Sequence, residues 1–251
     1  MNNAIYVKNV YKSFVEKKMP TVEALKGVDL EIKAGAFFGL LGPNGAGKST
    51  IINIITGLTS YNSGEVLVFD KSVKSDFQFT RSMIGLSPQE YKLDPFLFVK
   101  EELRMTGGFF GKPSKEIKER IPKLLAKLGL TEKANAYTDR ISGGMKRRVS
   151  VAKALIHEPC ILILDEPTAG LDVELREELW TLLEELNKSG ITILLTTHYL
   201  EEAEHLCDTI AIINDGQIKH IGENKKTNLR KASNLEMLYK EHTDVSKPDK
   251  F

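Results

Sequence analysis

The chain has 251 residues, of which 41% are hydrophobic and 27% are charged, so it is long enough to form one large core or two small ones. The 35 basic and 34 acidic residues leave a net charge of +1, which gives no overall field to recruit nucleic acid or an anionic membrane surface. The apolar runs at 36–41, 161–164 and 191–195 are much shorter than the roughly 20 residues of a transmembrane helix. The first residues also lack a basic segment followed by an apolar one, so we expect a protein that neither crosses a bilayer nor is exported.

The two cysteines, Cys160 and Cys207, form neither a C-x-x-C pair nor another spacing typical of a metal site. Both lie in apolar sequence. We therefore expect two buried, reduced thiols, which suit the cytosol.

Short β-rich runs come first along the chain. The most apolar of them, at 37–41, ends at a glycine-rich turn that is followed by a helical pattern. We expect strands at 4–10, 22–32, 37–41, 63–69 and 83–86, and a helix at 48–58.

The character of the sequence changes at about residue 94. From there to about 133 it loses β-branched alternation and gains helical patterns, which predicts a mostly helical insertion. Beyond residue 142 helices and strands alternate, as is typical of a parallel sheet covered on both faces. We expect helices at 142–157, 173–187 and 199–206, strands at 161–164 and 191–196, and a hairpin of 210–214 with 217–221 around Asp215-Gly216.

The glycine-rich turn after residue 41 has a known phosphate-binding pattern. Residues 42–49 read Gly-Pro-Asn-Gly-Ala-Gly-Lys-Ser, which matches the P-loop spacing G-x-x-x-x-G-K-[ST] in the strand, turn and helix order that a P-loop requires. The glycines let the backbone approach phosphate, Lys48 brings a charge to the β- and γ-phosphate oxygens, and Ser49 offers a hydroxyl to Mg²⁺. We expect ATP to contact Gly42, Asn44, Gly45, Ala46, Gly47, Lys48, Ser49 and Thr50.

A second glycine-bearing segment, Ser142-Gly143-Gly144-Met145, opens a predicted helix. Its backbone N–H groups, its hydroxyl and the positive helix end suit an anion, so the segment is a second candidate phosphate site. A P-loop alone leaves many classes of NTPase open, whereas two phosphate sites on one chain need an explanation. We expect Ser142, Gly143 and Gly144 to contact nucleotide.

Together these motifs resemble those of the ABC ATPases, in which the signature segment of one subunit closes on the P-loop nucleotide of another. The resemblance extends from Ile5 to about Gly222, and the sequences at 141–148 and 197–204 resemble those of the branch associated with ABC-2-type export permeases. The resemblance implies an α/β P-loop NTPase fold of ABC ATPase type, with a RecA-like parallel-sheet core, an antiparallel β subdomain and a helical subdomain. It places the ATP-binding domain at 1–222, the helical subdomain at about 94–150, and a short extension at 223–251 with a helix at about 234–242.

The acidic pair Asp165-Glu166 follows an apolar strand. There Asp165 can hold Mg²⁺ through water, and Glu166 is the candidate general base for the attacking water, while a simple loop cap is the alternative. The resemblance implies that the Gln89 side chain contacts Mg²⁺ or water and, being uncharged, can withdraw without leaving a buried charge. It also implies that His198 contacts the γ-phosphate and keeps the attacking water and Glu166 correctly positioned.

Two further positions rest on the resemblance. Phe14 falls where the family places an aromatic ring under adenine, and Tyr11 is the competing candidate, because either ring offers a π face for stacking. Asp172 falls in the segment whose acid crosses the dimer interface. Its alternative role is the N-cap of the next helix, and it can serve both.

The resemblance also implies partners. Two chains would lie head to tail with two ATP–Mg²⁺ between them, each site taking Ser142 and its glycines from the opposite chain. The dimer would drive a separate integral membrane permease from the cytoplasmic face of the membrane, and no nucleic-acid partner is expected. The aromatic set Phe96, Leu97, Phe98, Phe109 and Phe110 forms either a groove for that permease or the core of the helical subdomain.

Two rival functions are weaker. A soluble ABC ATPase of nucleic-acid repair would carry a long coiled coil between the P-loop and the signature, and this segment has no heptads; one of translation would usually carry two cassettes. A regulatory switch that does not turn over is opposed by Glu166 and His198. The sequence does not indicate the cargo, since a separate membrane subunit would select it.

Overall fold

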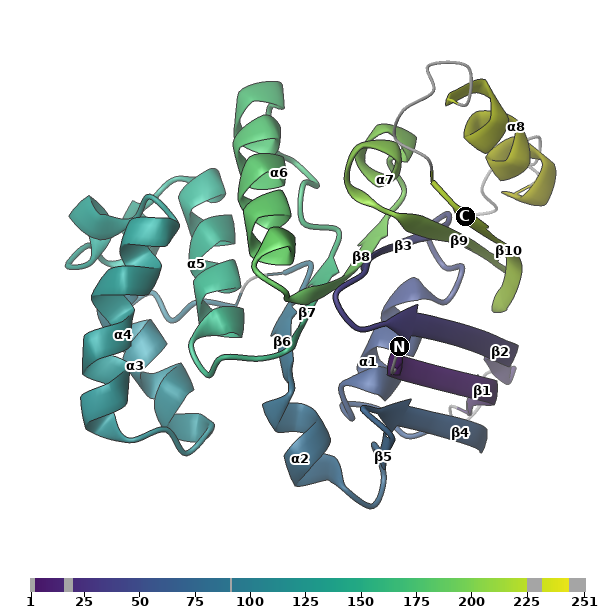
Figure 1. Ribbon diagram of the computed structural model, residues 1–251, viewed down its shortest axis with the longest axis horizontal. Helices are drawn as coiled ribbons and strands as arrows, with labels where there is room; N and C mark the ends of the chain where they lie inside the picture. The colour runs from purple at the N-terminus through teal and green to yellow at the C-terminus, as the bar shows by residue number, and fades with distance from the viewer. Residues whose placement is uncertain (1–2, 16–19, 91, 225–231, 244–251) are drawn as a thin grey trace. The chain divides into compact units, whose positions relative to one another are not determined.

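The computed structural model describes residues 3–15, 20–90, 92–224 and 232–243 of the chain (Figure 1). They divide into two compact units. The first unit contains the described residues up to 80 and those from 192 onward, and the second contains residues 81–191. Across these described ranges, no helix is both long enough and apolar enough to span a bilayer.

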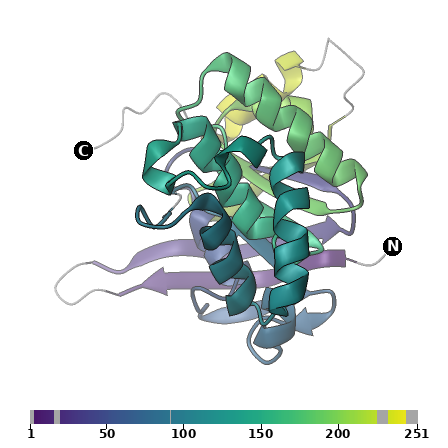
Figure 2. The same ribbon diagram turned by 90° about the vertical axis from the view of Figure 1, so that its left-hand side faces the viewer.

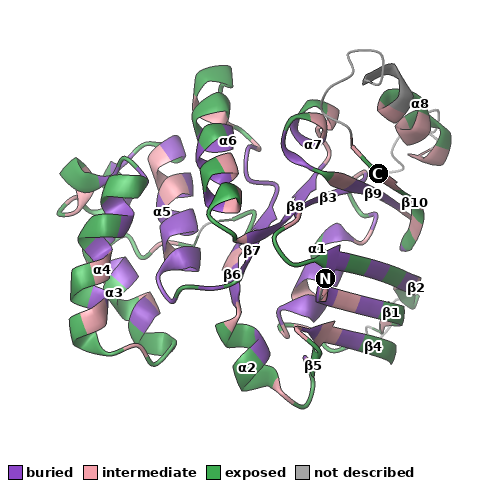
Figure 3. Cartoon of the chain, in the orientation of Figure 1, coloured by how far each residue is buried: buried purple, intermediate pink, exposed green. Residues whose placement is uncertain are grey.

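An antiparallel sheet forms one part of the first unit, in the strand order β2-β1-β4-β5. The two longest strands, β1 and β2, pair with each other, and β4 pairs with the other edge of β1. Buried and exposed residues alternate from Val28 to Lys33 on β2, as expected for a sheet with one face in the core (Figure 3). The strands are β1 (Asn3–Phe14), β2 (Val22–Lys33), β4 (Ser63–Val68) and β5 (Lys71–Ser72).

The parallel strands of the first unit are more deeply buried. β3 (Phe37–Leu41) lies between β8 (Thr192–Thr197) and β9 (Thr209–Asn214) and is parallel to both, and every residue of β3 and β8 is buried (Figure 3). β10 (Gln217–Glu223) returns antiparallel to β9. The two-residue turn Asp215-Gly216 joins them with both residues at positive φ, so the predicted hairpin is confirmed.

Three helices pack on the strands of the first unit. α1 (Lys48–Ile55) contacts β2 and β4, α7 (Leu200–Leu206) contacts β3 and β8, and α8 (Ala232–Thr243) contacts β9 and α7. α1 ends earlier than the predicted residue 58, because Gly57 adopts a φ of 70° directly after the helix cap.

α8 corresponds to the helix expected at 234–242. Leu235, Leu238 and Tyr239 are partly buried on one face, whereas Met237 is exposed. The polar tail expected to follow lies, from residue 244, outside the described residues.

The second unit combines two short parallel strands with a group of helices. α5 packs on β6, and α3 and α4 pack on each other and on α5 (Figure 2). The chain enters this unit through α2 (Phe77–Ser82), which the sequence did not predict, as it did not predict β5. The other elements are β6 (Ile84–Ser87), α3 (Val99–Phe109), α4 (Ser114–Lys127), the 3₁₀ turns Thr131–Lys133 and Thr138–Arg140, α5 (Gly143–Leu155), β7 (Ile161–Asp165) and α6 (Val173–Lys188).

α5 and β6 are in unusually close contact. A Cβ built on Gly85 would lie 2.0 Å from the backbone carbonyl oxygen of Ala154, so there is no room for a side chain. The buried hydroxyls of Ser87 and Ser150 are 2.8 Å apart. The ring of His157, just beyond α5, bonds through Nε2 to the first carbonyl of β6 at 2.9 Å. We call this line of contacts the α5–β6 seam.

The prediction for the cysteines was half wrong. Cys207 is buried against Gly39 in β3, where a Cβ on the glycine would lie 2.7 Å from its sulfur. Cys160 is exposed, because it occupies the loop before β7 rather than the strand itself. Neither cysteine forms a disulfide within the part of the chain that the structure describes.

The aromatic residues of the helical insertion do not form one groove. Phe96 and Phe109 are 84% and 83% exposed, but Phe96 comes three residues before α3 and Phe109 is the last residue of this helix, which is about 16 Å long. Phe98 packs against Tyr137, and Phe110 stacks on the ring of His157. Phe98 and Phe110 therefore pack against other rings, whereas Phe96 and Phe109 are exposed at separate places.

Candidate functional site

The segment after β3 forms a tight loop that requires glycine. Gly45 and Gly47 have φ values of 79° and 108°, in the left-handed region that other residues rarely adopt. At Gly42 the restriction is spatial, because a Cβ built there would lie 2.3 Å from the backbone carbonyl oxygen of Ile213. The loop therefore presents backbone to its surroundings, which is what close contact with phosphate requires.

Lys48, the first residue of α1, folds against this loop. Its side chain is buried, and Nζ donates to the carbonyl oxygens of Gly42 at 2.7 Å and Pro43 at 3.2 Å. In the described structure no side chain caps the start of α1, so the first N–H groups of the helix suit an anion. Of the other predicted contacts, Asn44 and Ser49 are exposed, Thr50 is partly buried and Ala46 is buried.

His198 lies at the same sheet edge as the P-loop. Leu41 pairs with Thr197 across β3 and β8, and the N–H of Gly42 donates to the Thr197 carbonyl at 3.3 Å. The next residue is His198, which is partly buried, with its ring centroid 4.0 Å from that of Tyr199. The structure thus brings this histidine beside the start of the P-loop.

The two candidate adenine platforms differ in their contacts. Tyr11 and Phe14 are 43% and 42% exposed, so exposure does not separate them. The Tyr11 ring lies over Gly27 on β2, close enough that a Cβ there would meet the hydroxyl at 2.8 Å. Phe14, at the end of β1, has the Lys12 ammonium 4.6 Å from its ring centroid. Tyr11 is therefore engaged in strand packing, which favours Phe14 as the ring for adenine.

The acidic pair of the second unit is buried at the end of β7. Asp165 and Glu166 are 8% and 4% exposed. Glu166 has a φ of 49°, a left-handed conformation that costs a non-glycine residue on the order of 1–3 kcal/mol. Such strain persists only where the surrounding structure holds the backbone in place.

Gln89 and the acidic pair follow neighbouring strands. Ser87 pairs with Leu164 across β6 and β7, so the chain segments after both strands leave the same edge. The side chain of Gln89 is exposed there. The structure therefore brings together the three residues of the second unit for which we predict Mg²⁺ or water contacts, namely Gln89, Asp165 and Glu166.

Arg147 was missed by the sequence analysis. It is only 2% exposed, and its guanidinium donates to three carbonyl oxygens, those of Pro88 at 2.9 Å, Gln89 at 3.1 Å and Glu166 at 3.2 Å. In the sequence it stands between Lys146 and Arg148, and such a run of cations is typical of an exposed, solvated surface. The signal that could have identified it is helical spacing, because Arg147 shares a face with the buried Val151 and Ala154.

The start of α5 is capped by its own serine. Ser142 Oγ accepts from the N–H of Met145 at 3.3 Å, and Ser142 and Gly143 are exposed. Gly144 is buried, and a Cβ there would lie 2.9 Å from the side chain of Leu175 on α6. The exposed helix start is thus carried by Ser142 and Gly143, while Gly144 allows close helix packing.

Asp172 is the N-cap of α6. Its carboxylate accepts from the N–H of Leu175 at 3.0 Å, and its side chain is exposed. The alternative role considered from the sequence is therefore observed, and it leaves the carboxylate accessible for a contact with a second chain.

The donor types predicted for Mg²⁺ are a hydroxyl from Ser49, a carboxylate from Asp165 and an amide oxygen from Gln89. These are hard oxygen ligands of the kind that Mg²⁺ prefers, and few protein ligands are usual where a substrate phosphate completes the shell. Each of these donor types therefore suits an ATP-bound magnesium ion.

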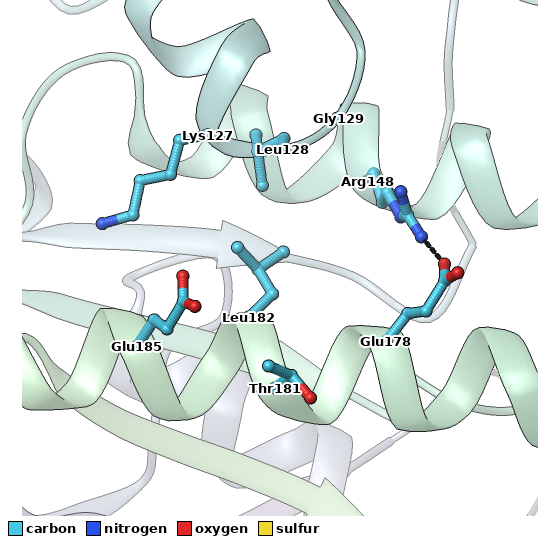
Figure 4. Close-up of a pocket in the computed structure, with 8 residues that line it drawn as sticks. All are labelled: Lys127, Leu128, Gly129, Arg148, Glu178, Thr181, Leu182 and Glu185. Atoms are coloured by element: carbon cyan, nitrogen blue, oxygen red, sulfur yellow. Dashed lines mark hydrogen bonds and ion pairs between the residues drawn. The ribbon is translucent and has the colours of Figure 1, made fainter.

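A separate cavity of about 340 Å³ lies among α4, α5 and α6 of the second unit (Figure 4). Its charged lining residues are Lys127, Arg148, Glu178 and Glu185, and Arg148 is ion-paired with Glu178 across it. None of the predicted site residues lines this cavity. Arg148 thus supports helix packing, in contrast with its neighbour Arg147.

The chain is similar to known proteins over most of its length. Residues 25–169 match the family model described as ABC transporter. The chain is 40% identical over 218 residues to the linearmycin resistance ATP-binding protein LnrL of Bacillus subtilis (strain 168), covering 87% of this chain and 68% of that protein. It is 46% identical over 190 residues to a Nod factor export ATP-binding protein I of Cupriavidus metallidurans, covering 76% and 63%. The chain thus spans about two thirds of the length of these relatives.

Solved structures resemble it as well. A dimeric ATP-binding cassette in a post-hydrolysis state with ADP and Pi is 31% identical, with a TM-score of 0.80 over 88% of this chain and 99% of that one. An ATP-binding subunit of an ABC transporter is 28% identical, with a TM-score of 0.81 over 97% of this chain and 100% of that one.

Proposed function

The chain belongs to the ABC transporter family, and from this we propose that it is the ATP-binding and ATP-hydrolysing subunit of an exporter, acting on a separate membrane permease. Its fold is the predicted α/β P-loop NTPase fold of ABC ATPase type, with parallel strands, an antiparallel sheet and a helical insertion. The observation that carries the proposal is the P-loop itself, a backbone cradle that excludes a side chain at Gly42 and has Lys48 folded beneath it.

We assign the residues the following roles. The P-loop backbone and Lys48 bind the phosphates of ATP and offset the charge that develops on the γ-phosphate. Glu166 takes a proton from the attacking water as its oxygen bonds to the γ-phosphorus and the bond to the ADP oxygen breaks. His198 orients that water, and Gln89 contacts it. When bound, Mg²⁺ would neutralise phosphate charge, held by Ser49, Asp165 and Gln89.

The complete unit in this proposal is a head-to-tail dimer. Each nucleotide is held by the P-loop of one chain and by Ser142 and Gly143 of the other, with Asp172 at the interface and adenine stacked on Phe14. The exposed, capped start of α5 supports this role, as does the dimeric state of the matching cassette. The two bound ATP molecules hold the two chains together, and hydrolysis of ATP allows the chains to separate.

Export and a permease partner rest on the relatives. One is named for resistance to linearmycin and the other for Nod factor export, and both names specify an ATP-binding protein. A permease at the membrane would place the chain at its cytoplasmic face. These names do not favour the rival function in nucleic-acid repair or translation. Purification from native membranes with the bound integral membrane protein identified tests this part, and recovery with ribosomes or DNA instead would contradict it.

The dimer is tested with a hydrolysis-deficient variant. Glu166→Gln preserves the shape of the side chain but removes the base, so kcat should fall by about 10² or more while ATP affinity is retained. With ATP this variant should elute as a dimer in size-exclusion chromatography. Adding Ser142→Arg should abolish the dimer, whereas Ser114→Arg, a matched change at the exposed start of α4, should not. A Glu166→Gln dimer that survives Ser142→Arg would exclude the shared site.

A further inference from the structure

The buried guanidinium of Arg147 joins two segments that the sequence separates. Its Nη1 bonds to the carbonyl of Pro88, and its Nη2 bonds to those of Gln89 and Glu166. Arginine has a planar fork of donors in fixed directions, so one side chain can hold several carbonyl groups at once. The segments after β6 and β7 are thus held together through their backbones.

The bond to Glu166 is made where the backbone is strained. Glu166 has a left-handed φ of 49°, and it precedes Pro167, which further restricts its backbone. Its carbonyl accepts both from Arg147 and from the N–H of Ala169 at 3.3 Å. Fixing this carbonyl opposes relaxation of the backbone, and such relaxation would move the attached carboxylate.

The same helix face continues the contact along β6. Arg147, Ser150 and Ala154 recur at the three- and four-residue spacing of one helix face, and they meet Gln89, Ser87 and Gly85 in turn. These three are alternate residues on and just beyond β6, so they follow the period of a strand. Because Ser142 caps the same helix, the Ser-Gly-Gly end and the Gln89 and Glu166 backbones are linked through one rigid element.

From these contacts we propose that Arg147 is a positioning residue for ATP hydrolysis. It holds the Glu166 backbone in its strained conformation and ties it to Gln89 and to α5. The inference rests on the proposed function, since the role of Glu166 as base belongs to it. Arg147 itself touches neither water nor nucleotide in this proposal.

The test compares Arg147→Met and Arg147→Lys with wild type in the full chain. Arg147→Met should lower kcat at least about 10-fold while the Kd for a fluorescent ATP analogue changes less than about 3-fold, because the P-loop is intact. Arg147→Lys keeps the charge without the fork, so it should retain an intermediate kcat. A third variant, Arg147→Ala, leaves space for a free guanidinium ion. Millimolar guanidinium should restore part of its kcat, and no such rescue is expected if the loss comes only from poorer packing.

The matched control is Arg120→Met. Arg120 is another arginine of the second unit, partly buried, and it donates to the Leu155 carbonyl and to Glu158, away from the acidic pair. We expect it to lower the melting temperature without changing kcat. If Arg147→Met does not fold, the lysine variant and guanidinium rescue decide the question.

Three results would overturn the inference: a folded Arg147→Met with a kcat within about 2-fold of wild type, an Arg147→Lys that matches Arg147→Met, or a loss that guanidinium does not relieve. The parallel Glu166→Gln variant separates this from the proposed function. Full activity of Glu166→Gln removes the base assignment itself, whereas an inactive Glu166→Gln beside a fully active Arg147→Met removes only the positioning role.

Discussion

The two groups of predicted site residues are built in different ways. The P-loop comes from one continuous segment after β3, and its form depends on the left-handed backbone at Gly45 and Gly47, while at Gly42 the carbonyl of Ile213 leaves no room for a side chain. The group in the second unit, Gln89, Asp165 and Glu166, comes from two segments, one after β6 and one at the end of β7, and Arg147 of α5 joins them.

This difference predicts how each group fails. A continuous loop should respond mainly to changes within it, and such changes should alter ATP affinity. An assembled group should respond to changes far along the chain, wherever they disturb the packing of α5 on β6, and these should alter turnover. Changes in the P-loop backbone and changes in the α5–β6 seam should therefore affect ATP affinity and turnover separately.

The largest effect is expected from Gly85→Ala, which lies in the α5–β6 seam and away from the acidic pair. Its new Cβ would meet a backbone carbonyl that cannot rotate away, so the free energy of unfolding should fall by about 3 kcal/mol. Turnover by the folded fraction should fall as well, because α5 is displaced. Urea unfolding and ATPase assays on the same preparation measure both.

Gly108→Ala is the matched control for that variant. No heavy atom lies within 4 Å of a Cβ built there, and the residue is in α3, so alanine should raise the free energy of unfolding by up to about 1 kcal/mol. Equal stability of the two variants would contradict the close contact between α5 and β6.

The next effect concerns Phe14, the proposed adenine-stacking ring in the first unit. Phe14→Ala should weaken ATP binding roughly 5-fold to 150-fold, since stacking on an aromatic ring contributes on the order of 1–3 kcal/mol. The kcat at saturating ATP should change little. Tyr11→Ala removes the contact over Gly27 and should leave affinity nearly unchanged. A nucleotide titration in which Tyr11→Ala is the weaker binder would reverse the assignment.

The last effect, which appears only below about pH 6.5, concerns His157, at the end of the seam. Burial lowers the pKa of His157 to about 4, and the nearby charges of Lys112 and Arg120 act in the same direction. The unfolded chain therefore binds the proton more readily, so stability should fall as pH drops from about 6.5 to about 4, by up to about 1.4 kcal/mol per pH unit. His157→Phe should flatten this dependence in urea unfolding, while the exposed His205→Gln should preserve it.

The elements that the sequence predicted best are those with local signals. The P-loop, the buried strands and the hairpin at Asp215-Gly216 each depend on contiguous residues, and the structure has all of them. α1 was predicted too long because the left-handed Gly57 was overlooked as a stop. β5 and α2 are too short to produce a clear period.

The features that the sequence could not predict are tertiary. Arg147 stands in a run of cations, and only the packing of α5 shows that one of the three is buried among carbonyl groups. Cys160 was expected to be buried because its neighbours are apolar, but it lies just before β7 and is exposed. The aromatic residues around α3 were grouped by proximity in sequence, whereas a helix separates Phe96 from Phe109.

The left-handed backbone at Glu166 has a consequence for selection experiments. Glycine and asparagine adopt this conformation more easily than glutamate does, so the residue that best suits the backbone differs from the one that the chemistry needs. A library screened only for survival of heating should therefore enrich substitutions at this position. Such a screen would yield proteins that are more thermostable than their parent and have no ATPase activity.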